Sequence, residues 1–509
     1  MNLAARETAD LNCYIRRMLS HASRKEMPRT LETSADKSFG DHDALWMWGI
    51  VAVGAVLRLI ALGHKSFWID EIASVAIARR AAPVFWHFLW HDEGNMAAYY
   101  VLLRPWLHFG YSEGVVRLLS VIPGVLSIPA MYVLGRRLFG RETGVLAAAL
   151  LALNPCAIAV SQEARAYSFV VLAVLLSTCI FVRLMEEPSY GVACAYAIVA
   201  GVTCYFHYFG VLVPAAHAIS LVAVPRSRRP WKKLWVAAAI IVVMAAPILW
   251  LIHVQDAGHI SWVQAPSLLE FYHLGVFLAA NGGKAVGVVL LGVELVLAGL
   301  FLAELKSLWR ESGADLQRWR YALPVSLVLS PIVITLLASI VRPAFYHRFL
   351  VICLPGWILM MAVGLQRIRG GAWRGCALAV VCILSAVSTV IVYRRVTEDW
   401  RGAVRYLISH AHPEDRVLYY QPVGEFAGES YRDWMAGGEP RPRAIGVDAT
   451  EGGWKSEVDG APRVWLVLFR VKGDDAGSRT IEQELMRRYQ VGEATFFPGV
   501  SVIEYVARQ

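Results

Sequence analysis

Long apolar stretches recur along most of this chain, and they limit its fold more than any other feature does. Between about residue 45 and about residue 393, such stretches reach roughly 18–25 residues, the length that a helix needs to cross a bilayer. These segments must be helical, because lipid offers no hydrogen-bond partners to backbone N–H and C=O groups. The sequence therefore predicts an all-α polytopic membrane domain over residues 45–393.

Hydropathy places about eleven spans in this domain. They are expected near residues 45–63, 115–134, 143–159, 164–182, 190–205, 208–224, 233–253, 285–304, 321–340, 349–366 and 375–393.

Basic residues gather in alternate loops between these spans, and the positive-inside rule assigns such loops to the cytoplasm. The polar tail 1–44 has no apolar secretory signal and is assigned to the same side. An odd number of spans then places residues 394–509 outside, so we expect a multi-pass protein of the inner (plasma) membrane with a cytoplasmic N-terminus. The net charge of +9 indicates this topology and not nucleic-acid binding. The basic loop residues are Arg136, Arg137, Arg141, Arg226, Arg228, Arg229, Lys232, Lys233, Lys306, Arg310, Arg318, Arg320, Arg367, Arg369 and Arg374.

The composition changes after residue 393. TEDWRGAVRYLISHAHPEDRVLYY predicts a helix, a turn and a strand. Further on, RVWLVLFRV and ATFFPGVSVIEYV predict strands that flank a helix in SRTIEQELMRRYQ. Residues 394–509 are therefore predicted to form a small soluble α/β domain on the extracytoplasmic side.

Asp70 and Glu71 lie a few residues beyond the first span, after the short loop GHKSFW with its interfacial anchor Trp68. The residues that follow, 72–80, read as an amphipathic helix in the membrane interface. Carboxylates in a first helical turn are stabilised by the helix dipole, which is one explanation of the pair. A functional site is the other, because charges at a membrane face are costly unless they pair or serve a site.

Other outer loops add further polar residues. His91 and Asp92 stand before a glycine turn, either in a solvated loop between two interfacial helices or in a site. Glu163 and Arg165 are two residues apart in SQEARAY, as a local ion pair or as substrate contacts. His207 stands among aromatic residues, as part of an interfacial aromatic belt or as a ligand.

Arg342 and Arg348 lie outside, against the positive-inside trend, so anionic partners are expected for them. Lipid head groups would suffice, but a substrate phosphate also suits guanidinium groups. We expect Arg58 to snorkel toward the outer end of the first span, and Arg117 to be an interfacial anchor.

Several motifs occur in an order that is more specific than any of them alone. They are WIDE after the first span, NMAAYYVLLRPWLHFGYSEGVVRLLSVIPGVLSIPAMYVLGRRLFG, LNPCAIAVSQEARAYSF, FHYFG, YHRFLVICLPG, and EDWRGAVRYL after the last span. Through them, residues 45–425 resemble membrane glycosyltransferases of the GT-C fold. The resemblance is to the family 39 branch, which is related to protein O-mannosyltransferases and the aminoarabinose transferase.

This resemblance implies transfer of a hexose or pentose from a polyprenyl-phosphate-linked donor to a lipid, glycan or protein acceptor on the outer face, with inversion. Asp70 would be the general base on the acceptor hydroxyl, and Glu71 would assist by orienting it or pairing with an arginine. Cationic groups would offset the charge of the leaving phosphate. From the outer loops and the resemblance together, the expected substrate-binding residues are His91, Asp92, Asn95, Glu163, Arg165, Tyr167, His207, Tyr346, His347 and Arg348.

Relatives often carry His-Pro-Pro or Lys-Pro-Pro before the Tyr-Tyr pair, where this chain has Asn95-Met96-Ala97. The basic residue of that triplet is missing here, and His91 is the candidate substitute. No cofactor is firmly implied, although the carboxylates could hold a divalent ion. The eight cysteines are scattered without a CxxC pair and predict apolar packing.

A transporter or flippase of a lipid-linked sugar is the alternative. Such proteins keep ionisable groups near mid-depth and often contain internal repeats. Here no clear repeat is visible and the unusual ionisable residues lie on one face, which favours the enzyme. A third reading, an inactive relative that only binds polyprenyl lipids, is disfavoured by the intact Asp70-Glu71 pair.

Overall fold

The computed structural model describes residues 41–254, 263–282, 285–311, 313–436, 440–448, 453–471 and 475–508. The predicted cytoplasmic tail, residues 1–44, lies almost entirely outside these ranges. Within them, the chain is helical as far as residue 394, and its first strand begins at Arg416.

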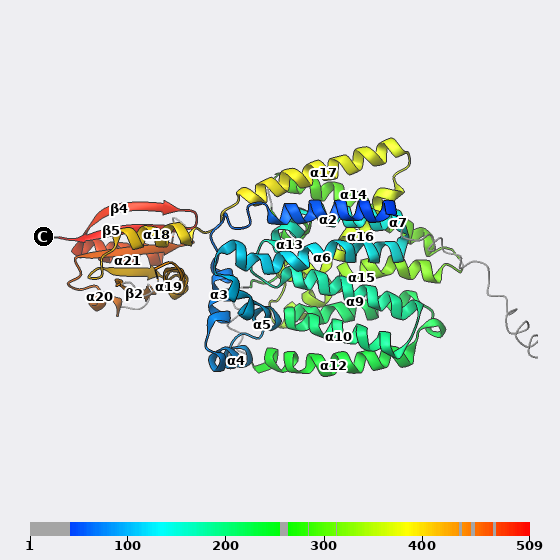
Figure 1. Cartoon of the computed structure of the whole chain (residues 1–509), viewed down its shortest axis with the longest axis horizontal. Coiled ribbons are helices and arrows are strands. Elements are labelled where there is room, and N and C mark those ends of the chain that lie inside the picture. Colours follow the sequence, from blue (N-terminus) through cyan, green and yellow to red (C-terminus); the bar gives the residue numbers. More distant parts are fainter. Residues whose placement is uncertain are drawn as a thin grey trace, which may run out of the picture. The chain divides into compact units, whose positions relative to one another are not determined.

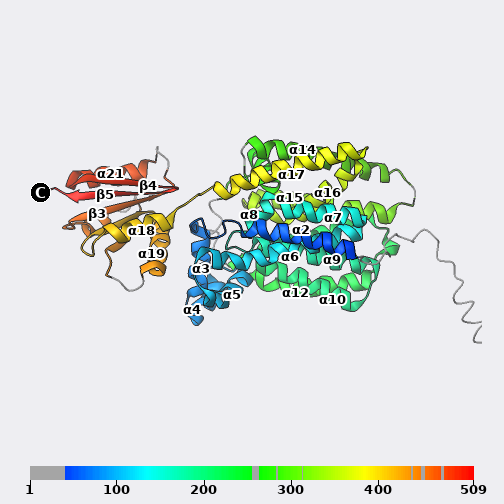
Figure 2. The same cartoon turned by 45° about the horizontal axis from the view of Figure 1, so that its top comes forward.

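The helices before residue 394 run alongside one another in a bundle (Figures 1 and 2). Its helices are α2 (Asp41–Leu59), α6 (Glu113–Phe139), α7 (Arg141–Leu153), α8 (Pro155–Ser161), α9 (Tyr167–Glu186), α10 (Tyr190–Phe206), η2 (Tyr208–Val211), α11 (Leu212–Ser220), α12 (Trp231–Val254), α13 (Leu268–Ala280), α14 (Ala285–Leu308), α15 (Asp315–Val341), η6 (His347–Cys353), α16 (Leu354–Arg367) and α17 (Gly371–Arg394).

Seven described helices are long and apolar enough to cross a membrane, and there are up to eight spans if the bent pair α7–α8 counts as one. Shorter apolar helices occupy the remaining predicted spans, at Leu45–Leu59, Tyr190–Phe206 and Tyr208–Ala223. Each predicted span thus contains a helix, and the predicted all-α polytopic fold is confirmed. One further apolar helix, α13, lies between the spans predicted at 233–253 and 285–304.

The span predicted at 143–159 is broken, with a bend of 57° between α7 and α8. Pro155 opens the second helix, and it has no N–H with which to continue the hydrogen-bond ladder of the first. Asn154 caps the new helix, because its side-chain oxygen accepts the Ala157 N–H at 2.8 Å. The break therefore leaves carbonyl groups at the end of α7 without helical partners.

Arg58 supplies those partners. Its guanidinium donates to the carbonyl oxygens of Leu151 at 3.2 Å and Ala152 at 3.1 Å. A third hydrogen bond goes to Ser161 Oγ at 3.2 Å. Arg58 is fully buried, so the expectation that it snorkels out of the span is wrong. A charged side chain is retained here because the broken helix offers several acceptors inside the bundle.

The centre of the bundle is α16. In the span that contains it, 89% of the apolar window is buried, against 28% for α12 and for α17. Gly364 permits this packing, because a side chain there would collide with the backbone of Leu297 on α14. The helices α12 and α17 accordingly present most of their apolar surface outward, as lipid-facing helices do.

Three short helices, α3 (Ile69–Arg79), α4 (Ala82–His91) and α5 (Ala97–Trp106), follow the first span and lie at one end of the bundle (Figures 1 and 2). The predicted amphipathic helix corresponds to α3. Ile72 and Val75 are fully buried on one side of it, whereas Asp70 in its first turn is partly exposed.

The predicted α/β domain is also confirmed. One five-stranded sheet has the order β2-β1-β3-β5-β4, parallel from β2 to β3 and antiparallel in the β5–β4 hairpin. Its elements are α18 (Trp400–His410), β1 (Arg416–Tyr420), α19 (Pro422–Ala436), β2 (Arg443–Val447), α20 (Trp454–Glu457), β3 (Arg463–Phe469), α21 (Ala476–Arg488), β4 (Tyr489–Phe497) and β5 (Val500–Ala507).

Both faces of the inner strands β1 and β3 are buried, whereas the edge strand β4 is largely exposed. Along β1, Val417 and Tyr419 join one hydrophobic cluster, and Leu418 and Tyr420 join another. This alternation follows from the two-residue period of a strand. Burial on both faces also explains why the sequences of β1 and β3 are almost continuously apolar.

The role of Arg58 can be tested by Arg58→Met. The substitution leaves the carbonyls at the end of α7 buried without donors, at about 1–3 kcal/mol for each lost partner. We expect a clear drop in the thermal unfolding temperature of the detergent-purified protein. The control is Arg183→Met on α9, whose side chain is 54% exposed and should be nearly neutral. Equal unfolding temperatures for the two variants would contradict this role.

Candidate active site

Two ion pairs meet where α3, the loop between α8 and α9, and η6 come together. Arg165 Nη2 lies 3.8 Å from Asp70 Oδ2. Arg348 pairs with Glu163. The local pair between Glu163 and Arg165 that their spacing allowed is therefore not formed, and each residue pairs with a charge far away in the sequence.

Asp70 and Glu71 are neighbours in sequence with opposite environments. The Asp70 side chain is 38% exposed and has Arg165 as its ion-pair partner. The Glu71 side chain is fully buried and is held by Arg117 at 2.6 and 2.8 Å. Glu71 also accepts the Ala164 N–H at 2.7 Å. Protein donors thus occupy both oxygens of Glu71, while Asp70 is the more accessible carboxylate of the two.

Arg117 is not the interfacial anchor that was expected. Only 4% of it is exposed, and besides Glu71 it donates to the carbonyls of Leu62, Lys65 and Ser66 at 2.9–3.0 Å. One buried guanidinium thereby fixes the loop that leads from the first span to α3. These contacts form because a buried charge must be paired and its N–H donors must be hydrogen-bonded.

Arg165 faces α3 and α5 with the rest of its guanidinium. Its Nη1 lies 3.4 Å from both Ser74 Oγ and the Asp70 carbonyl oxygen, and 3.5 Å from Tyr100 Oη. Its Nε is buried and has no hydrogen-bond partner among the described residues. These contacts are long for charge-assisted hydrogen bonds, so Arg165 has donor capacity left for an anionic ligand.

Arg348 lies in an aromatic setting. Its guanidinium carbon is 5.0 Å from the ring centre of Trp68 and 5.2 Å from that of Tyr167. Burial raises the pKa of its partner Glu163, and the positive charge of Arg348 opposes that shift. The Nε of Arg348 is also buried, and no described residue offers it a hydrogen bond. Tyr346 packs beside this group, with its ring 5.1 Å from Phe349.

His207 is buried beside the same aromatic residues. Its ring lies 6.1 Å from Tyr167 and 5.2 Å from Phe349, and its Nδ1 accepts the Phe209 N–H at 3.1 Å. Burial, with the positive charge of Arg165 as a second cause, lowers the pKa of His207 to about 3. His207 is therefore neutral at physiological pH, and its buried Nε2 has no partner among the described residues.

Three other predicted substrate-binding residues, His91, Asp92 and Asn95, lie outside this group of ion pairs. His91 stacks on His87 at 4.3 Å, and both His91 and Asp92 are exposed at the end of α4. Asn95 accepts the Tyr208 N–H at 3.2 Å and so connects the start of α5 to η2. Within the described residues, no contact joins these three to the two ion pairs.

Residues after the last span also hold the loop before Asp70, and no role was predicted for them. Glu398 is buried, accepts the Ile69 N–H at 2.9 Å, and pairs with Arg470. Tyr431 accepts the Phe67 N–H at 2.6 Å. Glu398 lies in the EDWRGAVRYL motif, but the sequence alone does not indicate that its side chain contacts the loop before Asp70.

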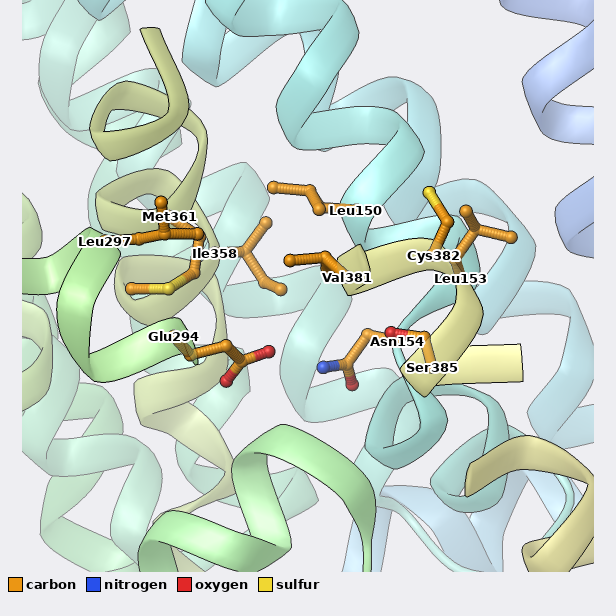
Figure 3. A pocket seen from close by; sticks show the side chains of 10 residues that line it. All are labelled: Leu150, Leu153, Asn154, Glu294, Leu297, Ile358, Met361, Val381, Cys382 and Ser385. Carbon is orange, nitrogen blue, oxygen red and sulfur yellow. The ribbon is translucent and has the colours of Figure 1, made fainter. Parts of the chain in front are cut away.

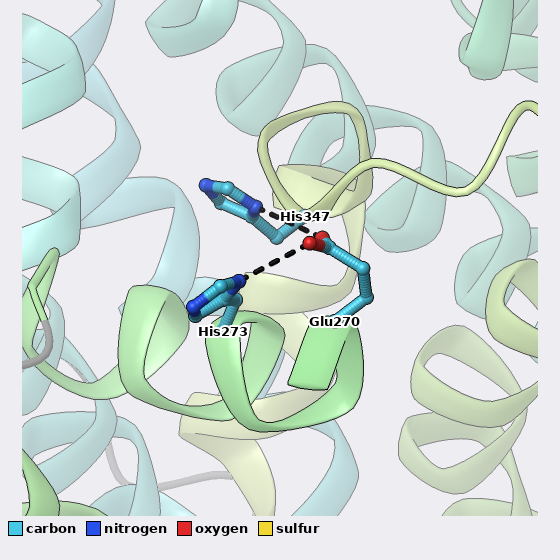
Figure 4. A group of neighbouring side chains, drawn as sticks. All are labelled: Glu270, His273 and His347. Atoms are coloured by element: carbon cyan, nitrogen blue, oxygen red, sulfur yellow. Dashed lines mark hydrogen bonds and ion pairs between the residues drawn. The ribbon is translucent and has the colours of Figure 1, made fainter. Parts of the chain in front are cut away.

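Two other features lie outside this group. Glu270, His273 and His347 approach one another (Figure 4). Within the described residues, these three side chains form a group that could bind a metal ion, and no such group is found at the predicted carboxylates. Inside the bundle, a small cavity is lined by Glu294, Asn154, Ser385 and apolar side chains (Figure 3), and Glu294 accepts a hydrogen bond from Trp357 Nε1 at 2.7 Å.

Comparison with known proteins identifies the fold. Residues 96–253 match the family described as dolichyl-phosphate-mannose-protein mannosyltransferase. The structure resembles ArnT from Cupriavidus metallidurans bound to undecaprenyl phosphate, with a TM-score of 0.60 at 13% identity over 91% of this chain and 98% of that one. It also resembles the Archaeoglobus fulgidus oligosaccharyltransferase, with a TM-score of 0.50 at 12% identity over 91% of this chain and 70% of that one. No curated protein matches the sequence.

The chain therefore has the GT-C fold of membrane glycosyltransferases, and the predicted resemblance is confirmed. Below 25% identity the structural likeness fixes the fold alone, so the reaction has to be inferred from the site.

The unlike roles of the two neighbouring carboxylates can be tested by comparing Glu71→Ala with Asp70→Asn. Glu71→Ala leaves Arg117 as an unpaired buried charge, which costs about 3–5 kcal/mol. We expect it to lower the unfolding temperature strongly or to abolish the folded protein. Asp70→Asn should leave the unfolding temperature nearly unchanged, because that side chain is partly exposed. Similar destabilisation by both variants would contradict the assignment.

Proposed function

We propose that this protein is a glycosyltransferase that moves a sugar from a polyprenyl-phosphate donor to an acceptor on the extracytoplasmic face, with inversion at the anomeric carbon. The observation that carries the proposal is the partly exposed carboxylate Asp70 with the Arg165 guanidinium beside it and a second guanidinium, Arg348, in the neighbouring ion pair with Glu163. The match of residues 96–253 to a mannosyltransferase family supports it.

In this reaction, Asp70 takes the proton of the acceptor hydroxyl while that oxygen attacks the anomeric carbon of the sugar. The bond between the anomeric carbon and the phosphate oxygen breaks, and its electron pair stays on the leaving phosphate. Attack from the side opposite the phosphate inverts the anomeric carbon. Asp70 suits the role of base because Glu71 is saturated by protein donors and Glu163 is paired with Arg348.

The arginines suit the other half of the reaction. Charge develops on the phosphate as its bond to the sugar breaks, and preorganised donors near it lower the barrier. In the part of the chain that the structure describes, Arg165 and Arg348 each have a buried Nε without a hydrogen-bond partner. We assign them to the donor phosphate, with Tyr167, Tyr346 and the neutral His207 forming the wall behind them.

The orientation of the protein follows from the charged loops and is part of the proposal. With the basic loops in the cytoplasm, Asp70, Glu163 and Arg348 are on the outer side, as is the α/β domain. A polyprenyl-phosphate sugar would reach them from the outer leaflet of the plasma membrane.

The experiment compares envelope glycans of a deletion strain that carries the wild-type gene, Asp70→Asn or Glu493→Gln. Loss of a general base typically lowers the rate by about 10²–10⁴-fold. We expect mass spectrometry to show one hexose or pentose missing with Asp70→Asn and restored by the other two genes. Glu493 is the control because it is an exposed acid on β4, outside the ion-pair group.

A second readout separates the transferase from a flippase. Cells with an inactive transferase should accumulate the polyprenyl-phosphate sugar on the outer face, where an added glycosidase or chemical label can reach it. Full glycan modification with Asp70→Asn would overturn the proposal. Accumulation of the lipid-linked sugar on the inner face would instead indicate a transporter.

A further inference from the structure

A carboxylate and two imidazoles gather between α13 and η6 (Figure 4). His273 Nδ1 lies 3.2 Å from Glu270 Oε1. His347 Nδ1 lies 3.5 Å from the other oxygen, Glu270 Oε2. One ligand atom from each of the three residues comes within 4.8 Å of the others.

The local structure explains this convergence. Glu270 and His273 are three residues apart on α13, so they share one face of the helix. His347 is the first residue of η6, directly after its N-cap residue Tyr346. The η6 segment packs against α13, with the Phe277 ring 5.4 Å from the His347 ring. Two elements far apart in the sequence thus present their ligands to the same point.

The chemistry of these side chains suits a metal ion. Imidazole nitrogens and carboxylate oxygens are the usual ligands of Zn²⁺, and imidazole also suits Co²⁺, Ni²⁺ and Cu²⁺. All three side chains are partly exposed, at 24% for Glu270, 39% for His273 and 23% for His347. A site with three protein ligands and access to solvent leaves further coordination positions for water or an anion.

We propose that Glu270, His273 and His347 form a binding site for a divalent transition-metal ion. The proposal does not rest on the proposed sugar transfer and extends beyond it. The ion would tie α13 to η6, and so hold the backbone of His347 next to Arg348 in the ion-pair group. Its role in the protein would be to fix the position of that arginine.

The alternative is a metal-free cluster in which Glu270 accepts hydrogen bonds from two histidines. Such a cluster explains the distances but predicts no affinity for metal. Metal binding therefore decides between the two, and it can be measured without knowing the sugar or the acceptor.

The experiment uses the full chain, purified in detergent through an affinity tag without histidine, treated with a chelator and dialysed. Co²⁺ is then added and measured by its visible absorption and by elemental analysis. We expect about one bound Co²⁺ per chain, displaced by Zn²⁺, because the three side chains describe a single site. The thermal unfolding temperature should rise on metal addition, since a ligand of the native state stabilises it.

The variants are Glu270→Gln, His273→Asn and His347→Asn, which nearly preserve size. Each removes a ligand, so we expect at least the roughly 10–100-fold loss of affinity that disturbing the surroundings of a metal site causes. The control is the double variant His87→Ala/His91→Ala, which removes two stacked histidines on α4. It should bind Co²⁺ as the wild type does.

Absence of bound Co²⁺ in the wild type would overturn the proposal, as would binding that the three variants retain. If an asparagine variant misfolds, Glu270→Gln still decides, because the amide keeps the shape and loses the charge of the ligand. Because metal binding and glycan transfer are measured separately, failure of this proposal is distinct from failure of the proposed function.

Discussion

The buried ion pair between Glu71 and Arg117 holds the candidate active site together. Glu71 connects α3 to α6 through Arg117, and connects both to the loop after α8 through the Ala164 N–H. Arg117 in turn binds three carbonyls of the loop that leads to α3. Two charges taken out of water must find their full set of partners, and this requirement fixes the backbone around them.

This arrangement places the two adjacent carboxylates in different environments. Glu71 points into the protein and sets the position of the first turn of α3. Asp70, one residue before it, points to the accessible side and faces Arg165. Contacts from after the last span, by Glu398 and Tyr431, hold the preceding residues from another direction. Asp70 is therefore an accessible carboxylate on a rigid support, as the proposed role of a positioned base requires.

Much of the fold could be predicted because a chain that crosses lipid must satisfy its backbone hydrogen bonds internally. Apolar stretches of spanning length each formed a helix, and the short apolar runs RVWLVLFRV and ATFFPGVSVIEYV identified strands of the α/β domain. The predicted snorkelling of Arg58 failed because its acceptors come from a helix break some 90 positions later, at Leu151 and Ala152. Pro155 was the visible signal for that break.

The candidate site was only partly predictable. The outer loops were expected to bring acids, histidines and arginines to one face, and Asp70, Glu163, Arg165, His207 and Arg348 do lie together. Their pairing could not be predicted from spacing. Glu163 pairs with Arg348 on η6, and Arg165 pairs with Asp70 on α3. For the same reason, the contact of His347 with Glu270, 77 positions away on α13, could not be read from the sequence.

The central claim is that the arginines beside Asp70 receive the phosphate of a polyprenyl donor. A cryo-electron microscopy structure of the protein in nanodiscs with undecaprenyl phosphate tests it most directly. We predict that the phosphate lies within hydrogen-bond distance of Arg165 or Arg348, on the accessible side of Asp70. A phosphate bound away from both arginines, or at the cavity beside Glu294, would contradict it.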